Sequence, residues 1–146
     1  MNIINYEYDH IVIETDERTI EIEKNLEKFL DNLCKQYGSS LKGRIDSFNY
    51  VLKTRQKTPI IVSMPNRVIL FPIYSIYGNK TTLLNYYSIK KISKKRDSTV
   101  ITFNNCNQIN LDIDYRMIKN QIKRIDSYLN YYQNLNSDAN NILNFC

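Results

Sequence analysis

The chain has 146 residues, of which 42% are hydrophobic and 24% charged, so its length and composition suit one domain with its own core. Only 3 glycines and 3 prolines are present, which excludes a disordered or linker-rich chain. No basic start precedes an apolar run, and no stretch approaches the roughly 18 apolar residues that cross a bilayer. We therefore expect one cytoplasmic domain over residues 1–135 and a polar, frayed tail over residues 136–146.

Charge is unevenly distributed along the chain, whose total is +5. Residues 1–36 hold nine acidic and four basic side chains, a net charge of −5. Residues 37–124 hold sixteen basic and four acidic side chains, a net charge of +12. Such a cationic region attracts polyanions, with nucleic acid as the usual target and an anionic membrane surface as the main competitor. Charge alone also fits a basic surface that has no partner.

The first predicted element is a strand over Tyr6–Glu14, which is rich in β-branched and aromatic residues. Apolar residues then recur at helical spacing and predict an amphipathic helix over residues 21–36. Gly38 stands where the end of a helix favours a residue with positive φ.

Beyond that helix the pattern changes to short β-branched runs separated by turns. A Met-Pro-Asn turn predicts a hairpin, and Pro72 ends its second strand because proline cannot donate to a central ladder. The predicted strands are residues 49–53, 59–63, 67–71, 86–92, 99–103 and 108–113, with a loop over residues 74–82.

A second helix follows, to about residue 134, with Asp114 as its cap. It carries one apolar stripe at steps of 4, 3, 4 and 3, formed by Ile118, Ile122, Ile125, Leu129 and Tyr132. Such a stripe indicates core packing, or a self-association seam as the alternative. The fold class is α+β: a mainly antiparallel curved sheet of about six to seven strands, with an N-terminal and a C-terminal helix packed on it. A pleckstrin-homology-like barrel is one version of this arrangement.

No pattern points to catalysis, to a metal or to a cofactor. The single histidine, His10, lies in a predicted strand, where packing explains it better than ligation. The three cysteines, Cys34, Cys106 and Cys146, share no close spacing, which fits reduced thiols rather than a zinc site or a disulfide framework. We expect a protein that is not an enzyme. Zinc-finger, zipper and helix-turn-helix patterns are also missing, so if the chain binds DNA, strands and loops would carry most contacts, or one terminal helix would.

Several short motifs occur in a fixed order. They are GSSLKGR at residues 38–44, KTPIIV at 57–62, NRVILFP at 66–72, TVITF at 99–103 and IDY at 113–115, followed by Gln121 and Arg124. In this order and spacing the chain resembles the competence transcription factor family, ComK, of Gram-positive bacteria. The likeness covers about residues 36–125. The tryptophan usual in the family is replaced by tyrosines near residue 86, since this chain has no tryptophan.

The resemblance implies a transcriptional activator of DNA-uptake genes that binds AT-rich promoter boxes. It further implies contact with the minor groove, DNA bending and assembly as a dimer or a dimer of dimers. Adaptor and protease machinery would be further partners, and no membrane would be involved. Physical chemistry agrees, because the narrow minor groove of A-tracts concentrates negative potential and attracts inserted arginine and lysine.

The candidate DNA-binding residues form four groups, each with a structural alternative. The first is a loop that suits phosphate oxygens or lets two elements pack, and the second is an i, i+2, i+4 series on one face of a predicted strand. The third is a basic cluster around a tight turn, and the fourth is one arginine in the Phe-Pro strand. The groups are Ser39, Ser40, Lys42 and Arg44; Lys53, Arg55 and Lys57; Lys90, Lys91, Lys94, Lys95 and Arg96; and Arg67.

Two other functions stay open. One is a pleckstrin-homology-like module that binds acidic lipid or an acidic protein, suggested by the strand-rich basic middle and the closing helix. The other is a diverged family member that has lost activation and acts as a competitor or heteropartner.

Overall fold

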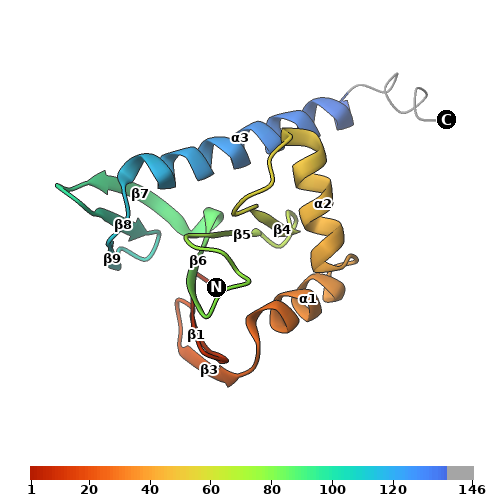
Figure 1. Cartoon of the computed structure of the whole chain (residues 1–146). Coiled ribbons are helices and arrows are strands. Elements are labelled where there is room, and N and C mark those ends of the chain that lie inside the picture. Colours follow the sequence, from red (N-terminus) through yellow and green to blue (C-terminus); the bar gives the residue numbers. More distant parts are fainter. Residues whose placement is uncertain (138–146) are drawn as a thin grey trace.

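The structure, a computed structural model, describes residues 1–137 and contains two antiparallel sheets and three helices (Figure 1). The larger sheet has the strand order β3-β2-β1-β6-β5-β4, and the smaller has the order β7-β8-β9. The strands are β1 (Ile3–Glu7), β2 (His10–Glu14), β3 (Thr19–Glu23), β4 (Ile60–Ser63), β5 (Val68–Pro72), β6 (Lys80–Asn85), β7 (Ile89–Lys94), β8 (Thr99–Phe103) and β9 (Gln108–Leu111). The helices are α1 (Leu26–Gln36), α2 (Leu41–Leu52) and α3 (Tyr115–Ser137), with a 3-10 turn η1 (Tyr86–Ser88).

The N-terminal strands differ from the sequence prediction. The predicted single strand over residues 6–14 is a hairpin, because Tyr8 and Asp9 both adopt positive φ, at 46° and 62°, and turn the chain between β1 and β2. The predicted helix start at residue 21 is wrong, since Thr19–Glu23 forms β3 and pairs with β2. Thr19–Glu23 alternates polar and apolar residues with the period of a strand, and α1 begins only after the Asn25 cap.

The prediction of a strand at residues 49–53 is also wrong, because these residues end α2 or cap it. Apolar side chains at positions 41, 45, 48 and 52 follow a helical spacing. Residues 49–53 alone are too few to show that spacing. Ser40 caps the N-terminus, where its hydroxyl accepts a hydrogen bond from the Gly43 amide at 2.9 Å. The chain leaves α2 through Lys53, in the left-handed region at φ 55°.

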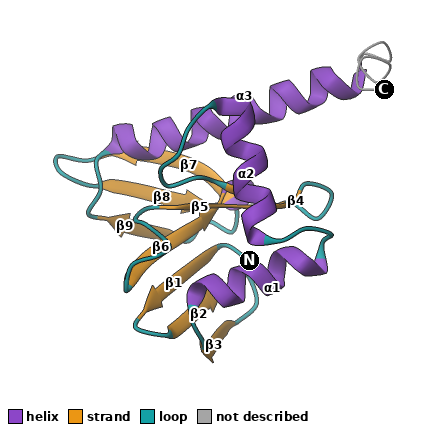
Figure 2. Cartoon of the chain, turned by 45° about the vertical axis from the view of Figure 1, so that its right-hand side comes forward, coloured by secondary structure: helices purple, strands orange, loops and turns teal. Residues whose placement is uncertain are grey.

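The core joins both sheets to α2 and α3. Ile118 and Ile125 of α3 are fully buried with Phe48 of α2 and Phe71 of β5. The Phe48 and Tyr128 rings stack with centroids 5.0 Å apart, which fastens α3 to α2. Figure 2 shows α3 lying above the small sheet and continuing past α2. The predicted C-terminal helix is therefore confirmed and ends slightly later, while most of the predicted tail lies outside the described residues.

The α+β class and the antiparallel sheet with a C-terminal helix are confirmed. A single curved barrel sheet is wrong, because β7, β8 and β9 form a sheet of their own. Strand β6, which lies between β1 and β5 in the larger sheet, was not predicted, since its first residues fall in the predicted loop and none of its residues falls in a predicted strand. The η1 turn replaces the start of the predicted strand 86–92. The η1 turn joins β6 of the larger sheet to β7 of the smaller one, so the chain leaves one sheet and enters the other there.

Candidate nucleic-acid interface

A groove of about 670 Å³ lies where α3 passes over η1 and β7. Five cations line it, from three separate segments: Arg67, Lys90, Lys91, Lys119 and Lys123. Three tyrosines, Tyr86, Tyr87 and Tyr115, also line it, and Asp126 contributes the one carboxylate among its described lining residues. The fold thus gathers Arg67 and two lysines of the predicted basic cluster at one surface. A cationic groove with amphipathic aromatic rings suits a polyanion.

The η1 turn at the base of the groove is positioned by Asn85, which is 3% exposed. The Asn85 amide nitrogen donates to the Met1 carbonyl at 2.8 Å and to the Arg67 carbonyl at 3.2 Å. Its side-chain oxygen accepts from the Ile69 and Tyr87 amides. One buried side chain therefore fixes the N-terminus, β5 and η1 relative to one another, because four hydrogen bonds in a buried site leave it little freedom.

Arg67 is held in place before any ligand binds. Its guanidinium carbon lies 4.7 Å from the centroid of the Tyr87 ring, a cation–π contact. Its backbone has φ 59° and its amide donates to the Met64 carbonyl, so the β4–β5 turn fixes its direction. An arginine that stacks on a ring and remains exposed loses less side-chain entropy on binding than a free one.

The candidate residues taken from the sequence include no cation of α3, although a terminal helix was one of the two elements expected to contact DNA. Lys119 and Lys123 lie one turn apart on that helix and face the groove, and the Lys119 ammonium is 5.8 Å from the Tyr115 ring. Arg116 extends the same side of the helix, because positions 116, 119 and 123 follow the i, i+3, i+7 rule. That spacing was present in the sequence and could have identified the basic face, which borders the apolar stripe at Ile122.

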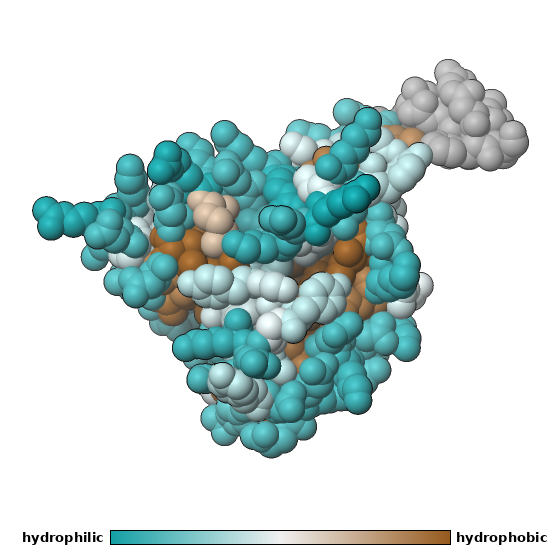
Figure 3. All heavy atoms as spheres, in the orientation of Figure 1, coloured by the Kyte–Doolittle hydropathy of each residue, from teal (hydrophilic) through white to brown (hydrophobic). Residues whose placement is uncertain are grey.

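A second hollow of about 260 Å³ holds the rest of the basic cluster. Lys94 at the end of β7 and Lys95 and Arg96 of the β7–β8 turn line it together with Tyr115 and Arg116. Two carboxylates, Asp97 and Asp114, also line it, and Asp114 pairs with Arg116 at 3.5 Å. Tyr115 also lines the first groove, so the two hollows adjoin at this residue. We call this combined surface, from Arg67 through Tyr115 to Arg96, the basic strip. Figure 3 shows hydrophilic side chains over the projecting β7–β8 turn and along α3.

The GSSLKGR loop lies away from the basic strip and has clear structural roles. Arg44 donates from Nη2 to the Tyr37 carbonyl at 2.9 Å, closing the α1–α2 connection. A Cβ added to Gly43 would stand 2.7 Å from the Ser39 hydroxyl oxygen, so glycine at this position lets the Ser39 side chain lie close to the α2 backbone. Lys42 pairs with Asp46 at 2.7 Å and borders a hollow that Glu27 and other acidic side chains line. The structure therefore does not bring Ser39, Ser40, Lys42 or Arg44 to the groove.

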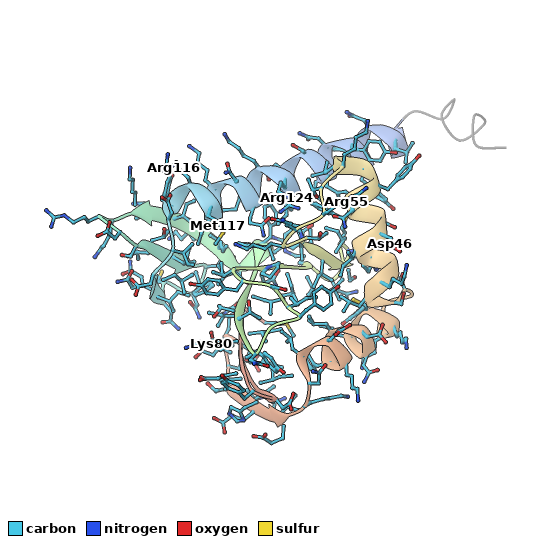
Figure 4. The ribbon with its side chains drawn as sticks, in the orientation of Figure 1. Asp46, Arg55, Lys80, Arg116, Met117 and Arg124 are labelled. Atoms are coloured by element: carbon cyan, nitrogen blue, oxygen red, sulfur yellow. The ribbon has the colours of Figure 1, made fainter. Side chains whose placement is uncertain are left out.

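The prediction that Lys53, Arg55 and Lys57 share one strand face is wrong, since Lys53 caps α2 and the other two lie in the α2–β4 connection. This connection is fastened by α3. Arg124 donates to the Thr54 hydroxyl at 2.7 Å and to the Lys57 carbonyl at 3.3 Å. Figure 4 shows Arg124 near Arg55 and well along α3 from Arg116. Burial lowers the pKa of Arg124 from its usual value, and no acid partner offsets that burial in residues 1–137.

The apolar stripe of α3 divides between core and surface. Ile118 and Ile125 are fully buried, and Ile122 lines the groove. Leu129 is half-buried, whereas Tyr132 is 39% exposed and stacks on Tyr128. Core packing accounts for the first part of the stripe, and the self-association seam stays a prediction for its C-terminal end.

Within residues 1–137, no group of three or more His, Cys, Asp or Glu side chains could hold a metal ion. His10 pairs with Glu23 across β2 and β3, Cys34 is a free buried thiol, and Cys106 is free and exposed. Cys146 lies outside the described residues. No described helix is both long and apolar enough to span a bilayer.

The chain is similar in sequence to a known transcription factor. The chain is 31% identical over 98 residues to the competence transcription factor of Bacillus subtilis (strain 168), an alignment that covers 66% of this chain and 51% of that protein. The chain thus spans about half the length of this curated relative. No solved structure matches the chain significantly. Residues 2–136 match the family described as ComK protein, which includes nearly every described residue. The chain therefore belongs to the ComK family.

Proposed function

We propose that this chain is a DNA-binding transcription factor of competence genes and that the basic strip is its DNA-contacting surface. The observation that carries the proposal is the adjoining of the two cationic hollows at Tyr115. The cations there come from four places: the β4–β5 turn, β7, the β7–β8 turn and α3. A polyanion that lies along several elements needs such a distribution of positive charge.

AT-rich duplex with contacts in the minor groove is the recognition mode that we favour. No helix inserts alone, since the strip mixes a helix face with turns. The minor groove offers few distinguishing hydrogen bonds, so its width and potential are recognised instead. Arg67, pre-positioned on Tyr87, is the side chain that we assign to that groove, while Lys119 and Lys123 would contact phosphates.

A binding experiment tests the surface directly. The double variant Lys119→Ala/Lys123→Ala removes two cations of the groove, and Lys24→Ala/Lys28→Ala removes two cations near the start of α1 as a charge-matched control. We expect the first variant to weaken binding to an AT-box duplex and to lower the salt-dependence slope by about 2, since each phosphate contact contributes close to one counterion. Equal effects of the two variants would remove the groove from the interface.

The sequence preference needs its own comparison. We expect the wild type to bind duplex with paired A/T runs more tightly than GC-rich duplex at physiological salt. Equal affinity for both would contradict AT-box recognition. Flotation with anionic vesicles in the presence of competing duplex tests the lipid-binding alternative, which predicts that the protein stays with the vesicles.

Activation is a separate part of the proposal. A promoter-reporter assay with competence-gene promoters should show a rise in expression when the chain is present. We also propose that the chain assembles as dimers or dimers of dimers on paired boxes. Its turnover would use adaptor and protease machinery. DNA binding without activation would instead indicate a competitor or heteropartner.

A further inference from the structure

Asp126 is an unneutralised negative charge in the cationic groove. It is the one acidic side chain among the described lining residues, and it is exposed. No lysine or arginine nitrogen of the described chain lies within 4.0 Å of its carboxylate, although five cations line the same groove. Its hydrogen-bond partner is the Tyr86 hydroxyl, which donates to Oδ1.

The position of this carboxylate is fixed by the turn at the base of the groove. Tyr86 belongs to η1 and packs edge-on against Tyr87, with ring centroids 5.3 Å apart. Asn85 holds that turn from the buried side. Burial, followed by the hydrogen bond to Asp126, raises the pKa of Tyr86 above its ordinary value, so its hydroxyl stays protonated and remains a donor.

Helix stability does not explain a carboxylate here. Asp126 lies near the middle of α3, too far from either end to interact with the helix dipole. Aspartate is also a poor helix former, and a neutral amide oxygen in the same place would also accept a hydrogen bond from Tyr86. The negative charge is therefore the property of this side chain that still needs a physical account.

We propose that Asp126 is a specificity-determining residue, which repels DNA phosphates from the Tyr86 side of the groove. This inference rests on the proposed function. A duplex that fits the basic strip places its phosphates against the lysines, whereas an ill-fitting duplex samples registers that bring phosphates to Asp126. Repulsion in those registers weakens wrong complexes more than right ones, which is how an unfavourable contact produces specificity.

The test compares two variants that change the net charge equally. Asp126→Asn keeps an oxygen that accepts from Tyr86, and Glu21→Gln removes one negative charge on β3, outside the groove. We expect Asp126→Asn to tighten binding to GC-rich duplex by about fivefold, the scale of one exposed charge–charge interaction, and binding to AT-box duplex by clearly less. Glu21→Gln should change both affinities little, because its charge lies away from the bound duplex.

Tyr86→Phe separates repulsion from positioning. It removes the hydrogen bond and keeps the charge, so it should not tighten binding to GC-rich duplex. The inference is overturned if Asp126→Asn matches Glu21→Gln, if it weakens binding to both duplexes, or if Tyr86→Phe reproduces its effect. Wild-type protein that binds neither duplex would overturn the proposed function, and this inference with it. If the wild type prefers AT-box duplex and Asp126→Asn has the same selectivity, this inference is refuted and the proposed function is not.

Discussion

Replacing Gln121 with leucine should destabilise the protein by roughly 3 kcal/mol. Gln121 is 3% exposed, and its amide donates to the Lys57 carbonyl at 2.8 Å and to the Pro72 carbonyl at 3.1 Å. Leucine fills similar space but donates nothing. A buried carbonyl that loses its donor costs about 1–3 kcal/mol, which applies to Pro72. The Lys57 carbonyl keeps its bond from Arg124, so its loss is nearer 1 kcal/mol.

Urea unfolding followed by circular dichroism measures the change. We expect a lower midpoint with an unchanged slope, which marks a loss of stability without a change in the surface exposed on unfolding. The neighbouring Asn120→Leu replaces an exposed amide on the same helix and should shift stability by no more than about 0.5 kcal/mol. If Gln121→Leu behaves like Asn120→Leu, the two hydrogen bonds do not fasten α3, and our explanation of how the helix is held beside the groove is refuted.

Three further changes have defined outcomes. Ser40→Ala removes the α2 cap and should cost about 1 kcal/mol in the same unfolding assay. Lys53→Gly should stabilise the protein by up to about 1 kcal/mol by relieving its positive φ, and reduced DNA affinity in the same variant would show that the side chain contacts DNA. Burial raises the pKa of Cys34 to about 11, so the folded thiol keeps its proton where the unfolded one loses it. Stability should therefore fall as pH rises from about 9 to 11, and Cys34→Ala should flatten that part of the profile.

The sequence predicted best those elements whose pattern is local and unambiguous. The β4–β5 hairpin and α3 are close to their predicted places because a proline-containing turn and a long helical stripe each have one interpretation. Predictions failed where two periodicities overlap. Ile20 and Ile22 alternate as in a strand, yet Ile22 also continues the stripe of α1, so only pairing with β2 decides that β3 is a strand.

The site shows a similar division between local pattern and tertiary arrangement. The cluster at Lys94–Arg96 was visible because its cations are contiguous in the sequence. That this cluster lies close to Arg67 and Lys119 depends on how η1 leads the chain from one sheet to the other. No local sequence pattern encodes that path. Lys53, Arg55 and Lys57 failed as a stripe because their two-residue spacing has meaning only on a strand, and the chain there ends a helix.

The most distinctive motif of the chain and its proposed DNA surface are different parts of the molecule. In GSSLKGR, Ser40 caps a helix, Gly43 admits a neighbouring hydroxyl and Arg44 closes a turn, so folding alone explains these three positions. Lys42 borders a hollow with four carboxylates, a potential that disfavours phosphate. The basic strip instead uses residues that form no compact motif. Family membership can therefore be inferred from residues that build the fold. Under the proposed function, binding strength depends on surface cations that the fold does not need, so a relative that keeps GSSLKGR need not keep the affinity for DNA.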